Sequence, residues 1–306
     1  MTMRVYTHPA CLLHDTGPGH AERPQRLRAV TEALREAFPD RLDWREAPRA
    51  SRGQLLRAHA PGLLDAVLET HPRERTMLDP DTVLSPDSDE AALRAAGAAA
   101  AAVDAALAGP APRAFCAVRP PGHHATHGIA MGFCLFNNIA IAALHALEAH
   151  GLERVAIVDF DVHHGNGTQA IFEHDRRVLF ASSHQWPLYP GTGARNETGA
   201  GNIVNAPLPP DADGAPFRAT WTDALLPAVD AFRPQLLLVS AGFDAHRRDP
   251  LAQLRLEAGD YAWITRELVR LANRHCAGRI VSTLEGGYDL EALRESSVAH
   301  VGELLA

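Results

Sequence analysis

The stretch Arg154–Gln169, RVAIVDFDVHHGNGTQ, begins as a continuous apolar run of strand length and ends in acids, histidines and glycines. An uninterrupted apolar run is typical of a strand buried on both faces of a parallel sheet. The polar residues that follow predict a functional site, because ligands of open α/β sheets bind at the carboxyl ends of the strands. Three interpretations are open at this point: a glycine turn that binds phosphate, a metal site, or ordinary buried polar residues.

The rest of the chain repeats this alternation of apolar runs and helical patterns. Further runs of strand length lie at Met3–His8, Ala114–Val118, Arg176–Ser183, Gln235–Gly242 and Arg279–Gly287. Helical patterns lie between them, for example at Phe136–Gly151 and Ala258–His275. The alternation predicts a three-layer α/β/α fold with a central, mainly parallel sheet. Without an internal repeat or a convincing linker, we expect a single domain over residues 1–306.

Composition narrows the classes of partner. The 306 residues carry a formal net charge of −8, which argues against nucleic acid as a direct partner. The four cysteines have no CxxC spacing and the N-terminus has no long apolar segment, so we expect a cytoplasmic protein with reduced thiols. The alanine-rich run Ala91–Gly109 contains Arg94 and Asp104, which predicts a close-packed helix rather than a membrane span. Composition leaves the oligomeric state open, including a homo-oligomer.

Polar motifs follow four of the predicted strands. They are RPPGHHA at Arg119–Ala125, DFDVHHGNG at Asp159–Gly167, AGFDAH at Ala241–His246 and LEGGYD at Leu284–Asp289. Because the carboxyl ends of parallel strands meet at one edge of a sheet, these motifs are expected to converge on one site.

The phosphate-binding interpretation fails on its second requirement. Gly165, Gly167 and Ala170 match the glycine fingerprint of a dinucleotide turn. That fingerprint also needs an acidic residue about 20 positions on, at the end of the next strand. The next predicted strand ends in Phe180–His184, FASSH, which has no acid. A nicotinamide-dependent dehydrogenase is therefore disfavoured.

A metal site explains the acids and histidines better. Residues two apart in an extended segment point the same way, so Asp161 and His163 form a chelating pair. Asp244, at the end of another predicted strand, supplies a third ligand. Two carboxylates and one imidazole leave a coordination position open, as a catalytic zinc-type site requires. A single buried aspartate is more often a hydrogen-bonded structural residue, but the whole set favours a metal.

The tandem His123-His124 suggests proton transfer, because histidine titrates nearest to neutral pH. An acceptor behind each ring would orient it. Asp159 is the natural partner for one ring and Asn166 a neutral partner for the other. Tyr288, after two glycines, is placed to donate a hydrogen bond to a developing oxyanion.

Together these motifs closely resemble those of the zinc-dependent histone deacetylase superfamily, which has the arginase/deacetylase α/β fold. GFCLFNN at Gly132–Asn138, YPGTG at Tyr189–Gly193 and the stretch His8–Leu27 extend the resemblance over essentially the whole chain. Asn166 makes the sequence similar to the class II-type bacterial histone deacetylase-like amidohydrolases and acetylpolyamine amidohydrolases, since class I enzymes carry aspartate there.

The resemblance implies one catalytic Zn²⁺ and a role for each motif residue. The implied zinc ligands are Asp161, His163 and Asp244. The implied catalytic residues are His123 and His124, with Asp159 and Asn166 behind them, and Tyr288 as the group that polarises the amide carbonyl. Gly242 stands where the two-manganese arginase-type enzymes have an additional aspartate, which favours a single metal.

The resemblance also implies a channel for the acyl-lysine chain and a structural K⁺. The implied substrate-binding residues are Gly132, Phe133 and Tyr189 along the channel, with Leu251 near its rim. Tyr189 departs from the phenylalanine usual in the family, which leaves the acyl-chain preference open. The family commonly holds potassium beside the zinc-ligand strand, at groups like Asp159 and Ser182.

The expected function is zinc-dependent removal of acetyl or other acyl groups from lysine side chains in proteins or peptides. The nearest alternative is an acetylpolyamine deacetylase, which favours an acidic rim. Leu251 argues against it, and the acidic loop Asp79–Glu90 is read as a solvated surface loop more readily than as the source of that charge. A non-catalytic binding protein on this scaffold would have lost a motif residue, and none is lost. His164 has no role that the sequence reveals.

Overall fold

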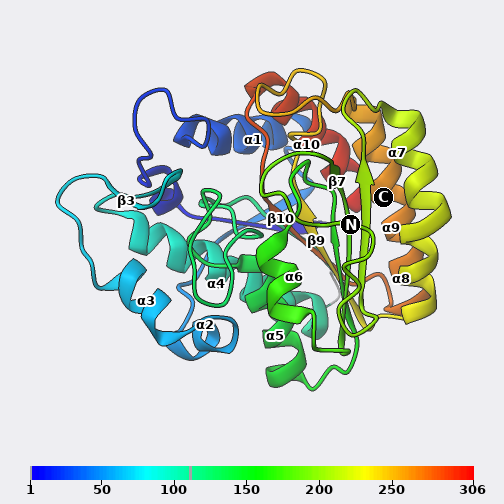
Figure 1. Ribbon diagram of the computed structural model, residues 1–306, viewed down its shortest axis with the longest axis horizontal. Helices are drawn as coiled ribbons and strands as arrows, with labels where there is room; N and C mark the ends of the chain where they lie inside the picture. The colour runs from blue at the N-terminus through cyan, green and yellow to red at the C-terminus, as the bar shows by residue number, and fades with distance from the viewer. Residues whose placement is uncertain (1, 110–111) are drawn as a thin grey trace.

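The computed structural model describes residues 2–109 and 112–306. Its centre is an eight-stranded sheet (Figure 1). The strands are β1 Met3–Thr7, β2 Leu42–Glu46, β5 Arg113–Cys116, β6 Val155–Asp159, β7 Val178–Gln185, β8 Ile203–Leu208, β9 Leu236–Ala241 and β10 Ile280–Leu284. Their order across the sheet is β2-β1-β5-β10-β9-β6-β7-β8, and every neighbouring pair is parallel. A separate antiparallel hairpin is formed by β3 (Thr76–Asp79) and β4 (Thr82–Leu84).

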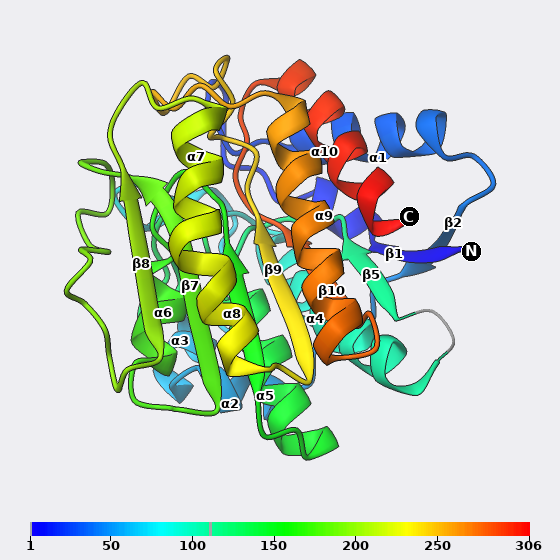
Figure 2. The ribbon, with the colours of Figure 1, turned by 90° about the vertical axis from the view of Figure 1, so that its right-hand side faces the viewer.

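Helices cover both faces of the sheet, as the sequence predicts. One face carries α4 (Ser88–Ala108), α5 (Asn138–His150) and α6 (Asn166–Phe172), with α2 (Arg52–Ala58) and α3 (Pro61–Leu68) outside them. The other face carries α1 (Pro24–Ala37), α7 (Gly214–Thr220), α8 (Leu226–Phe232), α9 (Ala258–His275) and α10 (Leu290–Leu304), seen in front of the sheet in Figure 2. A short helix η1 (Pro9–Leu12) follows β1, and the π-helical turn η2 (Trp221–Leu225) joins α7 to α8.

The strands predicted from apolar runs are the ones with two covered faces. Every residue of β5, β6, β9 and β10 is buried, so each needs an apolar side chain on both faces. β2 and β8, which form the two edges of the sheet, were not among the predicted strands. Edge strands are partly solvated: β2 carries charged residues in LDWRE, and β8 contains Asn205 and Pro207 in IVNAPL.

The alanine-rich run forms α4, which is long and apolar enough to cross a membrane by length and composition alone. Within the fold, 67% of its most apolar window is buried. The helix contacts α5 and the strands β1, β5 and β10. Small alanine side chains allow this close approach, so α4 has the environment of a core helix, in agreement with the expectation from Arg94 and Asp104.

His300, on α10, is a fully buried histidine, and we predict that it makes the fold sensitive to acid. It is hydrogen-bonded to Thr265 and Ser282, and burial lowers its pKa to about 3. In the unfolded chain the pKa is about 6.5. Its contribution to stability is therefore complete above pH 6.5. It is lost as the pH falls from 6.5 toward 3, by up to about tenfold in the unfolding equilibrium constant per pH unit.

Urea unfolding of wild type and His300→Gln at several pH values between 7.5 and 5 measures this effect. The stability difference between the two proteins should shrink as the pH falls, because glutamine has no proton to bind. The matched control is His174→Gln, since that side chain is 88% exposed. A stability difference that stays constant over this pH range would contradict the prediction.

Candidate active site

The motif residues meet at the carboxyl ends of the four central strands, β5, β10, β9 and β6. Asp161 and His163 follow β6, and Asp244 follows the neighbouring β9. His163 Nδ1 lies 3.2 Å from Asp161 Oδ1 and 3.2 Å from Asp244 Oδ2. All three side chains are buried, and their ligand atoms lie within 4.8 Å of one another. The structure thus assembles the three residues proposed as metal ligands from the sequence.

The donor set fits a divalent cation. Backbone N–H groups of Gly286 and Val162 donate to one oxygen each of Asp161 and Asp244, which orients both carboxylates. Asp244 Oδ2 is buried without a hydrogen-bond partner among the described residues, a costly arrangement for an acceptor-only oxygen. Zinc–ligand bonds of about 2.0–2.1 Å in tetrahedral geometry place ligand atoms about 3.3 Å apart. The observed 3.2 Å separations match that spacing.

Gly242 is a necessary part of this arrangement. A Cβ atom at residue 242 would lie 2.0 Å from Asp161 Oδ2, so no side chain fits there without displacing that carboxylate. An aspartate at this position, as a second metal would need, is incompatible with the observed placement of Asp161. Glycine at residue 242 therefore preserves the placement of the Asp161 carboxylate.

The tandem histidines each have the partner proposed for them. His123 Nδ1 lies 3.0 Å from Asp159 Oδ2, and His124 Nδ1 lies 2.7 Å from Asn166 Oδ1. A carboxylate can only accept, so His123 carries a proton on Nδ1 and its Nε2 points away from Asp159. The ring centroids are 4.0 Å apart. The side chain of Asn166 thus orients one histidine of the pair. The glycine-rich turn that carries Asn166 contributes to the histidine pair and not to a phosphate site.

The environments of the two rings push their pKa values in opposite directions. Burial alone would lower the pKa of His123, but the carboxylates of Asp161 and Asp159 outweigh it and raise the pKa to about 10. Burial, followed by the positive charge of His123, holds the pKa of His124 well below its usual range. His123 is thus the charged ring and His124 the neutral one, and because His124 Nδ1 faces Asn166 Oδ1, its Nε2 is left as the acceptor.

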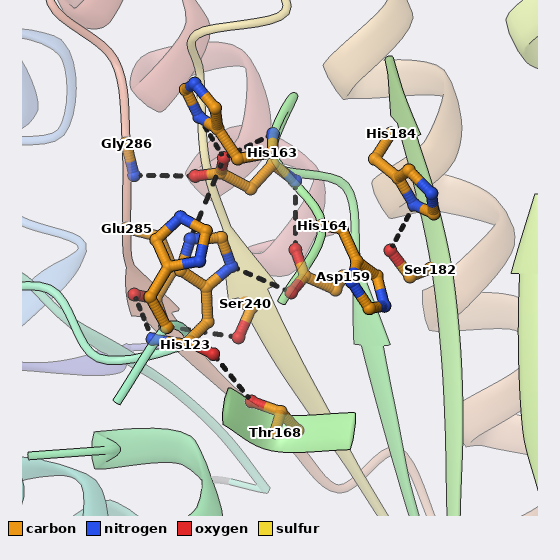
Figure 3. A network of polar contacts seen from close by, with 12 residues as sticks. His123, Asp159, His163, His164, Thr168, Ser182, His184, Ser240, Glu285 and Gly286 are labelled. Carbon is orange, nitrogen blue, oxygen red and sulfur yellow. Dashed lines mark hydrogen bonds and ion pairs between the residues drawn. The ribbon is translucent and has the colours of Figure 1, made fainter. Parts of the chain in front are cut away.

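Two buried carboxylates that the sequence reading missed hold the backbone of the site. Glu285 accepts hydrogen bonds from the N–H groups of Gly122 and His123 and from Ser240 Oγ (Figure 3). Asp249 accepts from the N–H groups of Tyr288, at 2.8 Å, and Leu251, at 3.0 Å. Glu285 stands in the EGGY motif and could have been suspected from it, whereas nothing in the local sequence marks Asp249.

Tyr288 is held from its other side by α1. The guanidinium of Arg26 lies 4.8 Å from the centroid of the tyrosine ring, and it donates to the carbonyls of Glu285 and Gly287. Arg26 is fully buried and forms an ion pair with Glu22, 3.0 Å away. Because this contact joins residues about 260 positions apart, no local pattern could have revealed it.

A pocket of about 260 Å³ opens onto these groups. Its lining residues are Asp81, His124, Gly132, Phe133, His163, Leu188, Tyr189, Leu251 and Tyr288. All four residues proposed for the substrate channel are in this lining, and Tyr189 and Leu251 are 38% and 37% exposed. Leu188 was not predicted, and Asp81 comes from the acidic loop that was expected to be a solvated surface. Asp81 accepts a hydrogen bond from the N–H of Gly132, 3.1 Å away, so this member of the acidic loop belongs to the pocket and not to a solvated surface.

A second group of metal-type side chains lies between α4 and α5, away from the sheet edge. His145 and His150 each place Nε2 2.7 Å from Asp104 Oδ1. Arg57 Nη1 lies 3.0 Å from His145 Nδ1, and a guanidinium can only donate. His145 therefore carries its proton on Nε2 and donates it to Asp104. A protonated ring nitrogen cannot bind a metal, so this group is a hydrogen-bonded link between the two helices.

Comparison with known proteins identifies the family. Residues 20–304 match the model of the histone deacetylase domain. The chain belongs to the histone deacetylase family. It is 41% identical over 298 residues to a probable deacetylase of Archaeoglobus fulgidus, covering 95% of this chain and 82% of that protein. It is 39% identical over 317 residues to the histone deacetylase-like amidohydrolase of Pseudomonas aeruginosa, covering 96% and 83%.

The three-dimensional match within the family is equally extensive. The crystal structure of the HDA15 HD domain superposes with a TM-score of 0.94 at 38% identity, covering 99% of this chain and 88% of that one. The family resemblance and the arginase/deacetylase-type fold expected from the sequence are therefore confirmed. The protein is a hydrolytic deacetylase or amidohydrolase of this family. Histone deacetylase domains generally use zinc, and the Asp161–His163–Asp244 group is the matching candidate here.

Proposed function

We propose that this protein is a zinc-dependent amidohydrolase that removes acetyl or other acyl groups from lysine side chains in proteins or peptides. One observation carries the proposal: a pocket lined by His124, Tyr288 and the aromatic rings of Phe133 and Tyr189 opens onto His163 of the three-ligand group. A pocket with aromatic walls accommodates an alkyl chain, and the polar groups it reaches are those that amide hydrolysis needs.

Asp161, His163 and Asp244 would hold the metal ion. When bound, Zn²⁺ supplies a Lewis acid that polarises the amide carbonyl and lowers the pKa of an attacking water. His124, whose Nδ1 is occupied by Asn166, presents Nε2 to accept the proton of that water. His123, oriented by Asp159, completes a pair that returns a proton to the leaving amine. The hydroxyl of Tyr288 donates a hydrogen bond to the oxygen that becomes negatively charged. Asp159 and Ser182, paired across β6 and β7, would contribute to the structural K⁺ site.

A kinetic panel of acetyl-lysine peptides, acetylputrescine, acetylspermidine and lysine peptides with longer acyl chains tests the proposal, together with the metal content of the purified protein. We expect about one zinc ion per chain and the highest kcat/KM on an acyl-lysine peptide. A zinc-free protein that hydrolyses none of these substrates would instead support the non-catalytic binding protein.

Asp81 favours an acetylpolyamine as the second candidate substrate. Its carboxylate lies in the lining of the pocket, where it can attract a distant ammonium group of a polyamine. Leu251, at 37% exposure on the same lining, offers no charge of its own. Asp81 would supply the acidic group that Leu251 does not offer.

Replacement of Asp81 by asparagine separates the two substrates. Asparagine keeps an oxygen to accept from Gly132 and removes the charge. We expect kcat/KM for acetylspermidine to fall about 5–10-fold, which is the effect of losing one partly exposed ion pair. For an uncharged acetyl-lysine peptide, kcat/KM should change less than about threefold. The control is Asp87→Asn, an exposed residue of the same acidic loop. Equal losses on both substrates would contradict charge recognition by Asp81.

A further inference from the structure

His164 follows the metal ligand His163 but is absent from the pocket lining. Its ring is buried and makes a hydrogen bond at each nitrogen: Nδ1 lies 2.8 Å from Thr192 Oγ1, and Nε2 lies 2.9 Å from Gln169 Oε1. Figure 3 shows the His164 ring beside Asp159, on the side where Ser182 and His184 lie. A buried histidine with both nitrogens occupied has a fixed orientation, so it can hold the groups that it contacts in place.

The direction of each hydrogen bond around His164 follows from one carboxylate. Glu197 can only accept, so Gln169 donates to it through Nε2, at 2.7 Å, and presents Oε1 to His164. His164 therefore carries its proton on Nε2 and accepts the hydroxyl proton of Thr192 at Nδ1. The N–H groups of Gly193 and Ala194 donate to Glu197. The hydrogen bonds thus form a closed cycle. It runs from Thr192 through His164, Gln169 and Glu197 back to the residues beside Thr192.

This hydrogen-bond cycle joins two segments of the chain. One follows the metal ligand His163, and the other carries Tyr189, which forms a wall of the pocket. Tyr189 lies three residues before Thr192, and its ring meets that of His124 edge-on with centroids 5.2 Å apart. Gly193 has φ +94°, and a Cβ there would lie 2.7 Å from the His164 ring and 2.5 Å from His184 Nε2. His184 Nε2 also bonds to the carbonyl of Gly193, at 2.9 Å. The segment therefore lies directly on two buried imidazoles.

We propose that His164 is a positioning residue that fixes the Tyr189–Gly193 segment through Thr192, and thereby sets the acyl-chain length that the pocket accepts. This inference rests on the proposed function. His164 joins the backbone of His163 to the wall, so the distance from the metal ligand to the tyrosine ring is held by side-chain hydrogen bonds. When the link to Thr192 is broken, the wall gains freedom while the metal ligands and the histidine pair keep their own contacts.

Thr192→Val tests the proposal, because valine keeps the volume of threonine and lacks the hydroxyl. We expect KM for an acetyl-lysine peptide to rise about 3–10-fold, as for the loss of one hydrogen bond, with kcat changed less than about threefold. The preference for an acetyl-lysine over a butanoyl-lysine peptide should fall at least about threefold, and amide hydrogen exchange should accelerate in residues 188–194. Thr192→Ser should restore wild-type values, and Thr198→Val, at an exposed position of the same loop, should leave them unchanged.

Two outcomes would overturn the inference. In the first, Thr192→Val has wild-type KM, acyl preference and hydrogen exchange. In the second, the variant loses zinc, thermal stability and kcat together, which is the signature of a general structural role. A wild-type protein inactive on every acyl-lysine substrate would count against the proposed function instead. Hydrogen exchange would still report in that case whether Thr192 holds the segment.

Discussion

Asp244→Asn is expected to lose at least about nine-tenths of the bound zinc and to lower kcat/KM about 10³-fold or more. Asparagine keeps an oxygen to accept from the N–H of Val162, so the fold around residue 244 should persist. The substitution removes the negative charge of the buried Oδ2, which has no hydrogen-bond partner among the described residues and which the metal would neutralise. Metal catalysis contributes several kcal/mol to such reactions, and about 1.4 kcal/mol corresponds to a factor of ten in rate.

Elemental analysis of the purified variant, beside steady-state kinetics and thermal unfolding, measures these effects. Asp104→Asn is the matched control, because Asp104 belongs to the other histidine–aspartate group. Its zinc content should equal that of the wild type, since His145 donates to Asp104 and does not bind a metal. A full zinc complement in Asp244→Asn would refute the ligand assignment, and zinc lost from Asp104→Asn would refute the interpretation of the helix-pair group.

Tyr288→Phe is expected to lower kcat by about 10²–10³ while zinc content and thermal stability stay near those of the wild type. The loss is the usual cost of removing one hydrogen-bond donor from an oxyanion site. The phenyl ring would keep the contacts that place Tyr288, namely the Arg26 guanidinium and the edge of Phe133 at 5.8 Å between centroids. Asp249 would still accept from the backbone N–H of residue 288.

Single-turnover kinetics would show whether the chemical step itself is slowed. Tyr6→Phe serves as the control, since Tyr6 lies on β1, away from the pocket, and its hydroxyl donates to the Ala101 carbonyl on α4. Near-normal kcat in Tyr288→Phe would remove this tyrosine from the catalytic assignment.

Much of the architecture was predictable because it depends on burial along single segments. The strands β5, β6, β9 and β10 are covered on both faces, and each therefore appears in the sequence as a continuous apolar run. The boundaries of α9 match the predicted Ala258–His275. The edge strand β2 was not predictable in this way, because its solvated residues are charged.

The sequence by itself determined the candidates for the reacting groups, since Asp161 and His163 are two residues apart and His123 and His124 are adjacent. Parallel topology then implied that Asp244 and Tyr288 would join them. Only the tertiary structure decided what holds these groups: Arg26 beneath Tyr288, Asp81 at the pocket and Thr192 on His164. Local patterns record burial and spacing within one segment. A hydrogen bond between segments far apart in the sequence exists only after the chain has brought them together, and so leaves no pattern in either one.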